Sequence, residues 1–343
     1  MPTTQHFLAP ELVEEMVSQV TLIDHGRRAD ANETLLVANA LTAAAIQTIG
    51  TIYPDLVARQ VANVNGAIDP GDDTYTWHRL DEVGMADYVA NMGDDIPLVD
   101  AYVMEQTGKV KHLATAFQYT TQDIRRMAAA RKNGRQASST LDVNKLAICD
   151  RVMERKKDDI FAFGDIGRQL PGMLTSANVT QVDAAQSATA GNPRSWMSTK
   201  TGDEILADML ASVTAVVNQS KGFFQPNKFL LPIDRYRKAA SEMVSKTGDT
   251  GRTVLLAFLE NCRLTGLTDM QVLAWDKCLT ADAGNPRGMC GRFDDTTLQL
   301  IDPLALTPTA PQPNNLAFKV PCEARCGGTV IYQPLAFVYL DQL

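Results

Sequence analysis

The chain has 343 residues and a formal net charge of −8 at pH 7. Hydrophobic residues make up 45% of it and charged residues 21%, which is ordinary for a folded protein and excludes wholesale disorder. The negative balance argues against a protein that grips nucleic acid over most of its surface.

The first part of the chain predicts neither a secretion signal nor a membrane anchor. Glu11, Glu14 and Glu15 stand where a signal peptide would need a basic start and an apolar run. Residues 34–54 carry no charge, but they are rich in alanine and include polar residues such as Asn39. A packed helix is therefore favoured over a membrane span.

Residues 1–60 predict helices, because apolar residues recur there at four-residue spacing. Turn signals follow from residue 65 to residue 72, and residues 74–79 combine aromatic residues with threonine, which is typical of a strand. A second extended stretch covers residues 98–119. Together these segments predict a long β-arm or hairpin whose tip is rich in glycine and aspartate.

The pattern then changes to that of helices. Residues 120–123 offer hydroxyl capping for a helix that continues to residue 132. Residues 141–163 predict a long helix, with apolar side chains on one stripe and basic side chains mostly off it. The expected stripe consists of Leu146, Cys149, Val152, Met153 and Ile160, and the basic residues expected off it are Arg151, Arg155, Lys156 and Lys157.

Residues 164–194 are rich in glycine and proline and predict a loop. Thr201-Gly-Asp-Glu204 is a capping box that opens a helix ending near Gly222. After it we expect a strand at 228–231 and helices at 235–244 and 253–261. Mixed strands up to residue 302 complete an α/β arrangement.

The C-terminal part is predicted to be β-structure. Pro303, Pro308, Pro311 and Pro313 indicate a stiff connection before it. Strands are expected at residues 316–322 and 329–339, joined by a two-residue turn at Gly327-Gly328, and Pro334 restricts pairing in the second strand.

No motif for catalysis, metal binding or cofactor binding is apparent. The four histidines are isolated, and neither a phosphate-binding loop nor a nucleophile elbow occurs. Zinc at Cys322 and Cys326 with Cys278 or Cys290 is an alternative, but the spacings match no strong zinc pattern. Cys149 and Cys262 complete a set of six cysteines that is too sparse for a disulfide scaffold, so reduced thiols are expected. The sequence thus predicts no enzyme, no metal and no cofactor.

Charge is distributed unevenly along the chain. Residues 69–100 contain nine acidic residues and one basic residue, whereas residues 121–157 contain ten basic and four acidic residues. Both could be ordinary solvated faces. The alternative is self-assembly, in which the acidic arm of one copy lies on the basic helix of another and apolar side chains, including Tyr75, Met85 and Tyr88, hold the contact. The candidate interface residues are Asp72, Asp73, Trp77, Asp81, Glu82, Arg125, Arg126 and Arg131.

Several short motifs follow one another in a defined order. They are DEVGMA (81–86), DDIPLV (94–99), FQYTTQDI (117–124), FAFGD (161–165), LPGML (170–174), NL (315–316), VPCEARCGG (320–328) and YQP (332–334). Their order and spacing resemble the major capsid proteins of tailed bacteriophages, which have the Hong Kong 97-type fold.

This resemblance implies an α+β capsid fold and a division of the chain. An N-terminal arm would cover residues 1–64 and an extended β-loop residues 65–110. A peripheral domain with a long spine helix would cover residues 111–200 and be completed by 313–343, and an inserted α/β axial domain would cover residues 201–312. The implied function is a structural subunit that self-assembles into hexamers and pentamers of an icosahedral head around double-stranded DNA.

The resemblance also implies partners. Only about sixty residues precede the loop, which leaves no room for a built-in scaffolding segment, so a separate scaffolding protein is expected, with a portal and a possible decoration protein. Contact with DNA would be non-specific, no membrane is involved, and assembly would occur in the bacterial cytoplasm. Residues 65–100 contain no lysine, so lysine–asparagine cross-linking is not expected. The alternatives are an encapsulin-type compartment and a cytosolic enzyme with a site in residues 201–302.

Overall fold

The computed structural model describes most of the chain beyond its first 55 residues, and the helices expected before that point lie outside the described residues. Residues Pro54–Leu343 form one compact unit. The described residues are 56–86, 88, 98–125, 139–188, 194–198, 200–244 and 251–343, with only the backbone described for 139–144.

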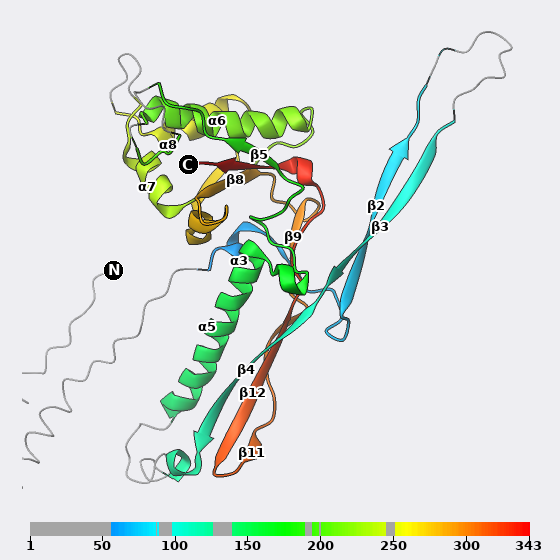
Figure 1. Cartoon of the computed structure of the whole chain (residues 1–343), viewed down its shortest axis with the longest axis vertical. Coiled ribbons are helices and arrows are strands. Elements are labelled where there is room, and N and C mark those ends of the chain that lie inside the picture. Colours follow the sequence, from blue (N-terminus) through cyan, green and yellow to red (C-terminus); the bar gives the residue numbers. More distant parts are fainter. Residues whose placement is uncertain are drawn as a thin grey trace, which may run out of the picture. The chain divides into compact units, whose positions relative to one another are not determined.

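A long two-stranded hairpin is the first major element, and it confirms the predicted β-arm (Figure 1). β2 (Thr74–Val83) and β3 (Asp100–Lys109) pair antiparallel over ten residues each, from Thr74 opposite Lys109 to Val83 opposite Asp100. They form a sheet of their own.

After Val110 the chain continues as β4 (Lys111–Thr120), which enters a second sheet. There β4 pairs antiparallel with β12 (Ala317–Cys326) over ten residues, and the other edge of β12 pairs with β10 (Leu304–Pro308) and β11 (Gln312–Asn314).

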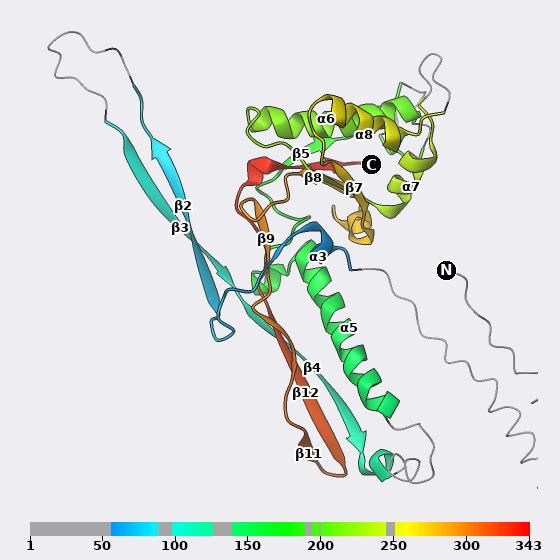
Figure 2. The ribbon, with the colours of Figure 1, turned by 180° about the vertical axis from the view of Figure 1, so that it is seen from behind.

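The long helix α5 (Ser139–Phe163) lies beside β4 and β12, as both views show (Figures 1 and 2). Its existence and length confirm the prediction. The capping expected after β4 is also confirmed, because the Asp123 amide donates to Thr120 Oγ1 at 3.1 Å and the Thr120 amide donates to Asp123 Oδ2 at 3.3 Å.

A five-stranded sheet with three helices makes up the α/β part. Thr201 and Glu204 form the predicted capping box of its first helix, with the Thr201 amide donating to Glu204 Oε2 at 2.9 Å. Two other helices and the strand at 228–231 also occur where they were expected. In sheet order the strands are β5 (Thr180–Asp183), β14 (Phe337–Asp341), β8 (Arg287–Gly291), β6 (Lys228–Leu231) and β7 (Gln271–Ala274), and the helices are α6 (Gly202–Gln219), α7 (Ile233–Ser241) and α8 (Val254–Leu264).

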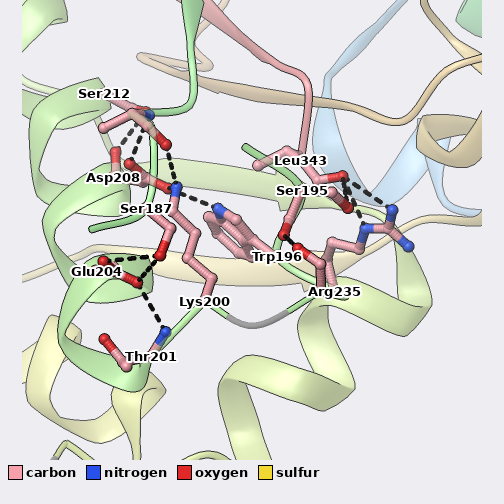
Figure 3. A network of polar contacts seen from close by, with 12 residues as sticks. Ser187, Ser195, Trp196, Lys200, Thr201, Glu204, Asp208, Ser212, Arg235 and Leu343 are labelled. Atoms are coloured by element: carbon pink, nitrogen blue, oxygen red, sulfur yellow. Dashed lines mark hydrogen bonds and ion pairs between the residues drawn. The ribbon is translucent and has the colours of Figure 1, made fainter. Parts of the chain in front are cut away.

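A buried polar network fixes the segment that precedes α6 (Figure 3). Asp208 of α6 receives a hydrogen bond from Trp196 Nε1 at 2.8 Å and pairs with the buried ammonium of Lys200. Ser187 donates to Glu204 at 3.0 Å. Because each buried charge has a partner, these contacts hold the segment in place without an unsatisfied group.

The prediction that Gly327-Gly328 forms a two-residue hairpin turn was wrong, because the strands before and after it do not pair with each other. β12 pairs with β4, β10 and β11, whereas β13 (Gly328–Ile331) pairs with β9 (Leu298–Ile301) in a third sheet that also contains β1 (Val64–Asn65). The glycines permit a close crossing instead: a Cβ on Gly327 would lie 2.5 Å from Ile301 Cγ2, and Gly328 has a φ of +78°.

Strand pairing also differs from the predicted division of the chain. β5 and β14, expected in the peripheral part, join the five-stranded sheet of the α/β part. β10, expected in the axial part, pairs with β12. All five residues of β14 are buried, and that requires neighbours on both faces and both edges.

Lys157 corrects the expected helix stripe, because its side chain is fully buried rather than off the apolar face. It lies four residues after Met153 and three before Ile160, so the helical period places it among them. Its ammonium donates to Asp302 Oδ1 at 2.7 Å. Conversely, Val152 is 50% exposed, although the stripe was expected to include it.

Two further residues bear on the predicted stripe: Leu146 near its start, and Arg59, which binds the charged residues around Lys157. Leu146 is also exposed, at 36%. Arg59, just upstream of β1, completes the buried charge cluster by binding Asp302 and Glu154, with Arg59 Nε 2.8 Å from Glu154 Oε2. The helix face that holds Lys157 and Glu154 therefore depends on charged groups from two distant parts of the chain, the Asp302 carboxylate and the Arg59 guanidinium.

Candidate subunit interface

One face of the inner half of the hairpin is packed against its own chain, while Thr74, Thr76 and His78 on the other face are exposed. Tyr75 is only 8% exposed, and its ring stacks on Trp77 with centroids 5.7 Å apart. Trp77 in turn meets Tyr332 edge-on at 6.0 Å. The Tyr75 hydroxyl donates to the Gly327 carbonyl at 3.3 Å, and burial raises its pKa. The candidate residue Trp77 thus anchors the base of the hairpin.

Two acidic candidates lie in the turn that leads into β2. Asp72 is exposed, and its amide donates to the Asp69 carbonyl at 3.0 Å. Asp73 forms an ion pair with Arg325, which also donates to the Pro70 carbonyl. The Asp73 side chain is 85% exposed, whereas that of Arg325 is only 12% exposed. Water screens the carboxylate, so the pair contributes little to stability but orients the turn.

The outer half of the hairpin has no such covering. From Leu80 onward every residue of β2 is exposed, and so is the facing part of β3. Leu80 lies opposite Val103, and these side chains are 59% and 63% exposed. Val83, Tyr102 and Met104 are 54%, 53% and 53% exposed. Exposed apolar side chains gathered on one element are typical of an interaction surface.

Alternation along the strands divides these side chains between two faces. Residues directly opposite in an antiparallel pair share a face, so Leu80 and Val103 lie together on what we term the Leu80 face. Tyr102 and Asp81 lie together on the other, the Tyr102 face. Glu82 belongs to the Leu80 face. The candidates Asp81 and Glu82 therefore point in opposite directions and do not contact one flat surface together.

The basic segment is described only in part. Arg125 is exposed in the helical turn that follows β4, while Arg126 and Arg131 lie outside the described residues. Within the described part of the chain, Arg125 forms no ion pair with Asp81 or Glu82, so the structure of one copy does not bring the acidic and basic candidates together.

The outward face of α5 carries both basic and apolar side chains. Arg151 and Lys156 are exposed, beside Ile148 at 53% and Val152 at 50%. Lys145 is partly used within the chain, since it donates to the Gln118 carbonyl at 2.8 Å. The sequence correctly indicated a basic helix here, but it did not reveal the apolar side chains exposed among the charges.

The described residues offer little for catalysis. They contain no group of three or more histidine, cysteine or acidic residues placed to hold a metal ion, and no helix among them is both long and apolar enough to cross a membrane. All six cysteines are buried without a disulfide, and burial raises the pKa of the Cys262 thiol to about 11. A buried, protonated thiol of this kind is a poor nucleophile.

A projecting hairpin with bare apolar faces on an otherwise well-packed body is typical of a subunit that other subunits complete. A family model described as "Major capsid protein" matches residues 84–343. The chain therefore belongs to the major capsid protein family, and it is a structural protein of the phage head.

Solved structures show the same fold. The capsid of Myoviridae phage XM1 matches with a TM-score of 0.70 at 15% identity, covering 87% of this chain and 95% of that one. The capsid protein of the native GTA particle matches with a TM-score of 0.56 at 14% identity, covering 86% and 93%. A chain in the structure of Mycobacterium phage Adephagia matches with a TM-score of 0.54 at 11% identity, covering 95% of this chain and 92% of that one.

No curated protein sequence matches the chain. At these identities the structural matches establish the fold, and they confirm the expected α+β capsid fold of the Hong Kong 97 type. The family and its structural neighbours are shell components rather than enzymes.

Proposed function

We propose that this protein forms the hexamers and pentamers of an icosahedral head around packaged double-stranded DNA, and that the hairpin of one copy lies on a neighbouring copy. The observation that carries the proposal is the contrast along β2 and β3: Tyr75 and Trp77 are packed, whereas Leu80, Tyr102 and Val103 are exposed.

Apolar burial supplies the energy of this contact. Covering the exposed part of each large apolar side chain in the outer hairpin contributes about 1 kcal/mol. The summed contribution of five such side chains, before the free-energy cost of association is subtracted, is that of a weak contact. A shell repeats such a contact many times. They are Leu80, Val83, Tyr102, Val103 and Met104.

Charge sets the orientation of the contact. The outer hairpin carries Asp81, Glu82 and Asp100, while Arg125 stands exposed after β4. Facing charges of opposite sign accelerate encounter and disfavour wrong registers more than they add affinity. The surface that receives the hairpin would include Arg125, with Arg126 and Arg131 from the sequence beside it.

Charge reversal tests this arrangement. In the triple variant Arg125→Glu, Arg126→Glu and Arg131→Glu we expect at least a tenfold loss of particles by negative-stain electron microscopy, with an unchanged melting temperature. The control reverses three exposed basic residues elsewhere: Lys221→Glu, Arg237→Glu and Arg263→Glu. Unchanged particle yield in the first variant, or equal loss in both, would contradict the proposal.

Other parts of the proposal concern partners. A separate scaffolding protein, a portal and a possible decoration protein would take part, with assembly in the bacterial cytoplasm. Co-expression with the scaffolding protein should raise the yield of closed shells over that of the chain alone. The family match does not favour the encapsulin-type alternative.

A further inference from the structure

Two cysteines that are far apart in the sequence meet between the long helix and the sheet beside it. Cys149 belongs to α5 and is 7% exposed, and Cys322 belongs to β12 and is fully buried. Their thiols form a side-chain hydrogen bond with each other. Neither residue is a candidate for the subunit interface, so the pair requires an explanation of its own.

The local structure of both elements brings these thiols together. Every second residue of β12 from Val320 to Cys326 is buried, so Cys322 points to the covered face of its sheet. On α5, Cys149 and Met153 are one helical turn apart and both are buried. Since α5 packs against β4 and β12, the two buried rows face each other (Figure 1).

The cover over this pair is thin. Cys322 lies opposite Thr115 of β4, whose side chain points to the same face and is only partly buried. Ile148, directly before Cys149, is exposed. Only alternate residues of β12 are fully buried, because the other face of this sheet is not covered by a helix. A molecule as small as dioxygen can therefore reach the two sulfur atoms.

A second pair of cysteines lies deeper. Cys262 of α8 and Cys290 of β8 are near each other in the α/β part. All five residues of β8 are buried, so Cys290 has packed side chains on both faces of its strand. This pair therefore has the neighbours of a core residue, whereas the pair at α5 and β12 lies beneath a single helix.

We propose that Cys149 and Cys322 are a latent disulfide, which forms when the protein leaves a reducing compartment and meets dioxygen. The two S–H bonds break and one S–S bond forms. The thiols lose two electrons and two protons to dioxygen, which leaves as hydrogen peroxide. Thiols in hydrogen-bond contact then move to a separation of about 2 Å, which side-chain rotation and a small shift of the helix supply.

The reduced state persists in a reducing cell for two reasons. Glutathione and thioredoxin keep intracellular thiols reduced. In addition, burial and then the neighbouring Cys149 thiol raise the pKa of Cys322, so it remains protonated at neutral pH. The oxidation is therefore slow, and the subunit folds without the cross-link.

The disulfide would staple α5 to the sheet of β4 and β12. Because it joins segments that are distant in sequence, it restricts the unfolded chain strongly and stabilises the folded one. The bond itself is independent of the proposed function. Its use rests on that function: a released head would become more resistant to unfolding than the shell assembled inside the cell.

Mass spectrometry and thermal unfolding test the inference. The sample is the purified full-length chain, first reduced and then exposed to air with copper–phenanthroline as the catalyst. Alkylation under denaturing conditions should find four free thiols instead of six, and a digest should contain a linked peptide pair with Cys149 and Cys322. We expect the melting temperature to rise by about 5 °C on oxidation and to fall again with dithiothreitol.

Matched variants separate this bond from other oxidation. Cys149→Ala should lose both the linked peptides and the rise in melting temperature. Cys326→Ala removes another buried thiol from the same face of β12 and should keep both. Each variant is compared with its own reduced form, so the stability cost of the substitution itself cancels.

Six free thiols after oxidation, a bond from Cys322 to any other cysteine, or an unchanged melting temperature would overturn the proposal. These results do not depend on whether the chain forms shells, so they are distinct from a failure of the proposed function.

Discussion

The inner and outer halves of the hairpin share the same strands and one continuous register, yet they differ in what covers their side chains. At the base, Tyr75 and Trp77 rest on the body of the same chain. Beyond Arg79, side chains of similar hydrophobicity such as Leu80 and Val103 are exposed. Backbone pairing alone therefore does not complete this element; the inner half is a folding contact, and we propose that the outer half is an assembly contact.

The largest effect is expected from charges in the outer half. The double variant Leu80→Asp and Val103→Asp should abolish particles in electron micrographs, because it places two like charges where apolar contact is needed. Its unfolding free energy should stay within about 1 kcal/mol of the wild type, since both sites are exposed. The matched control, Thr76→Asp with Thr107→Asp, places the same charges across the inner half and should keep most of the yield.

The body should show the opposite behaviour. Asp302→Ala leaves the ammonium of Lys157 buried without its carboxylate and should lower the unfolding free energy by about 3–5 kcal/mol in urea titrations. Asp295→Ala, an exposed site on the same segment, should cost less than about 1 kcal/mol. Equal effects of the two variants would show that the buried pair has no special role.

A smaller loss is expected at the base of the hairpin. Trp77→Ala removes the ring between Tyr75 and Tyr332 and should cost about 2 kcal/mol, because the side chain is only half-buried. Faster hydrogen exchange in β2 and β3, with no change in α6, would locate the loss. Trp77→Phe should recover part of it; exchange that rises uniformly through the chain would argue against a local anchor.

The smallest effect is expected at the turn. Asp73→Asn removes the ion pair with Arg325 but leaves an exposed site, so the change should be below about 1 kcal/mol and should shrink further in 1 M salt. Urea titrations at low and high salt measure it. A cost above about 2 kcal/mol that does not depend on salt would mean that the turn is held by something other than this charge pair.

Local features were predictable from the sequence, because local patterns encode them. The alternation of residues 74–79, the Thr201 capping box and the long helix all appear where they were expected. The same alternation placed Asp81 and Glu82 on opposite faces, although as interface candidates they had been grouped by charge alone.

Features that depend on distant parts of the chain could not be predicted. The burial of Lys157 requires Asp302, which is 145 residues away. The close crossing at Gly327-Gly328 depends on residues far along the chain, such as Ile301, that lie against these glycines. From the sequence alone, a Gly-Gly pair between two strands indicates an ordinary hairpin turn. For the candidate interface, the sequence supplied the charges and a few apolar candidates, of which Tyr75 is buried within its own chain. The structure added the exposed apolar side chains of Leu80, Tyr102 and Val103.

The most direct test of the central claim is a cryo-electron microscopy map of shells assembled from this chain. The map should show residues 79–83 and 100–104 in contact with other copies, while Tyr75 and Trp77 keep their contacts with their own chain. A hairpin whose outer half is folded back onto its own subunit, or stands free in solvent, would contradict the account.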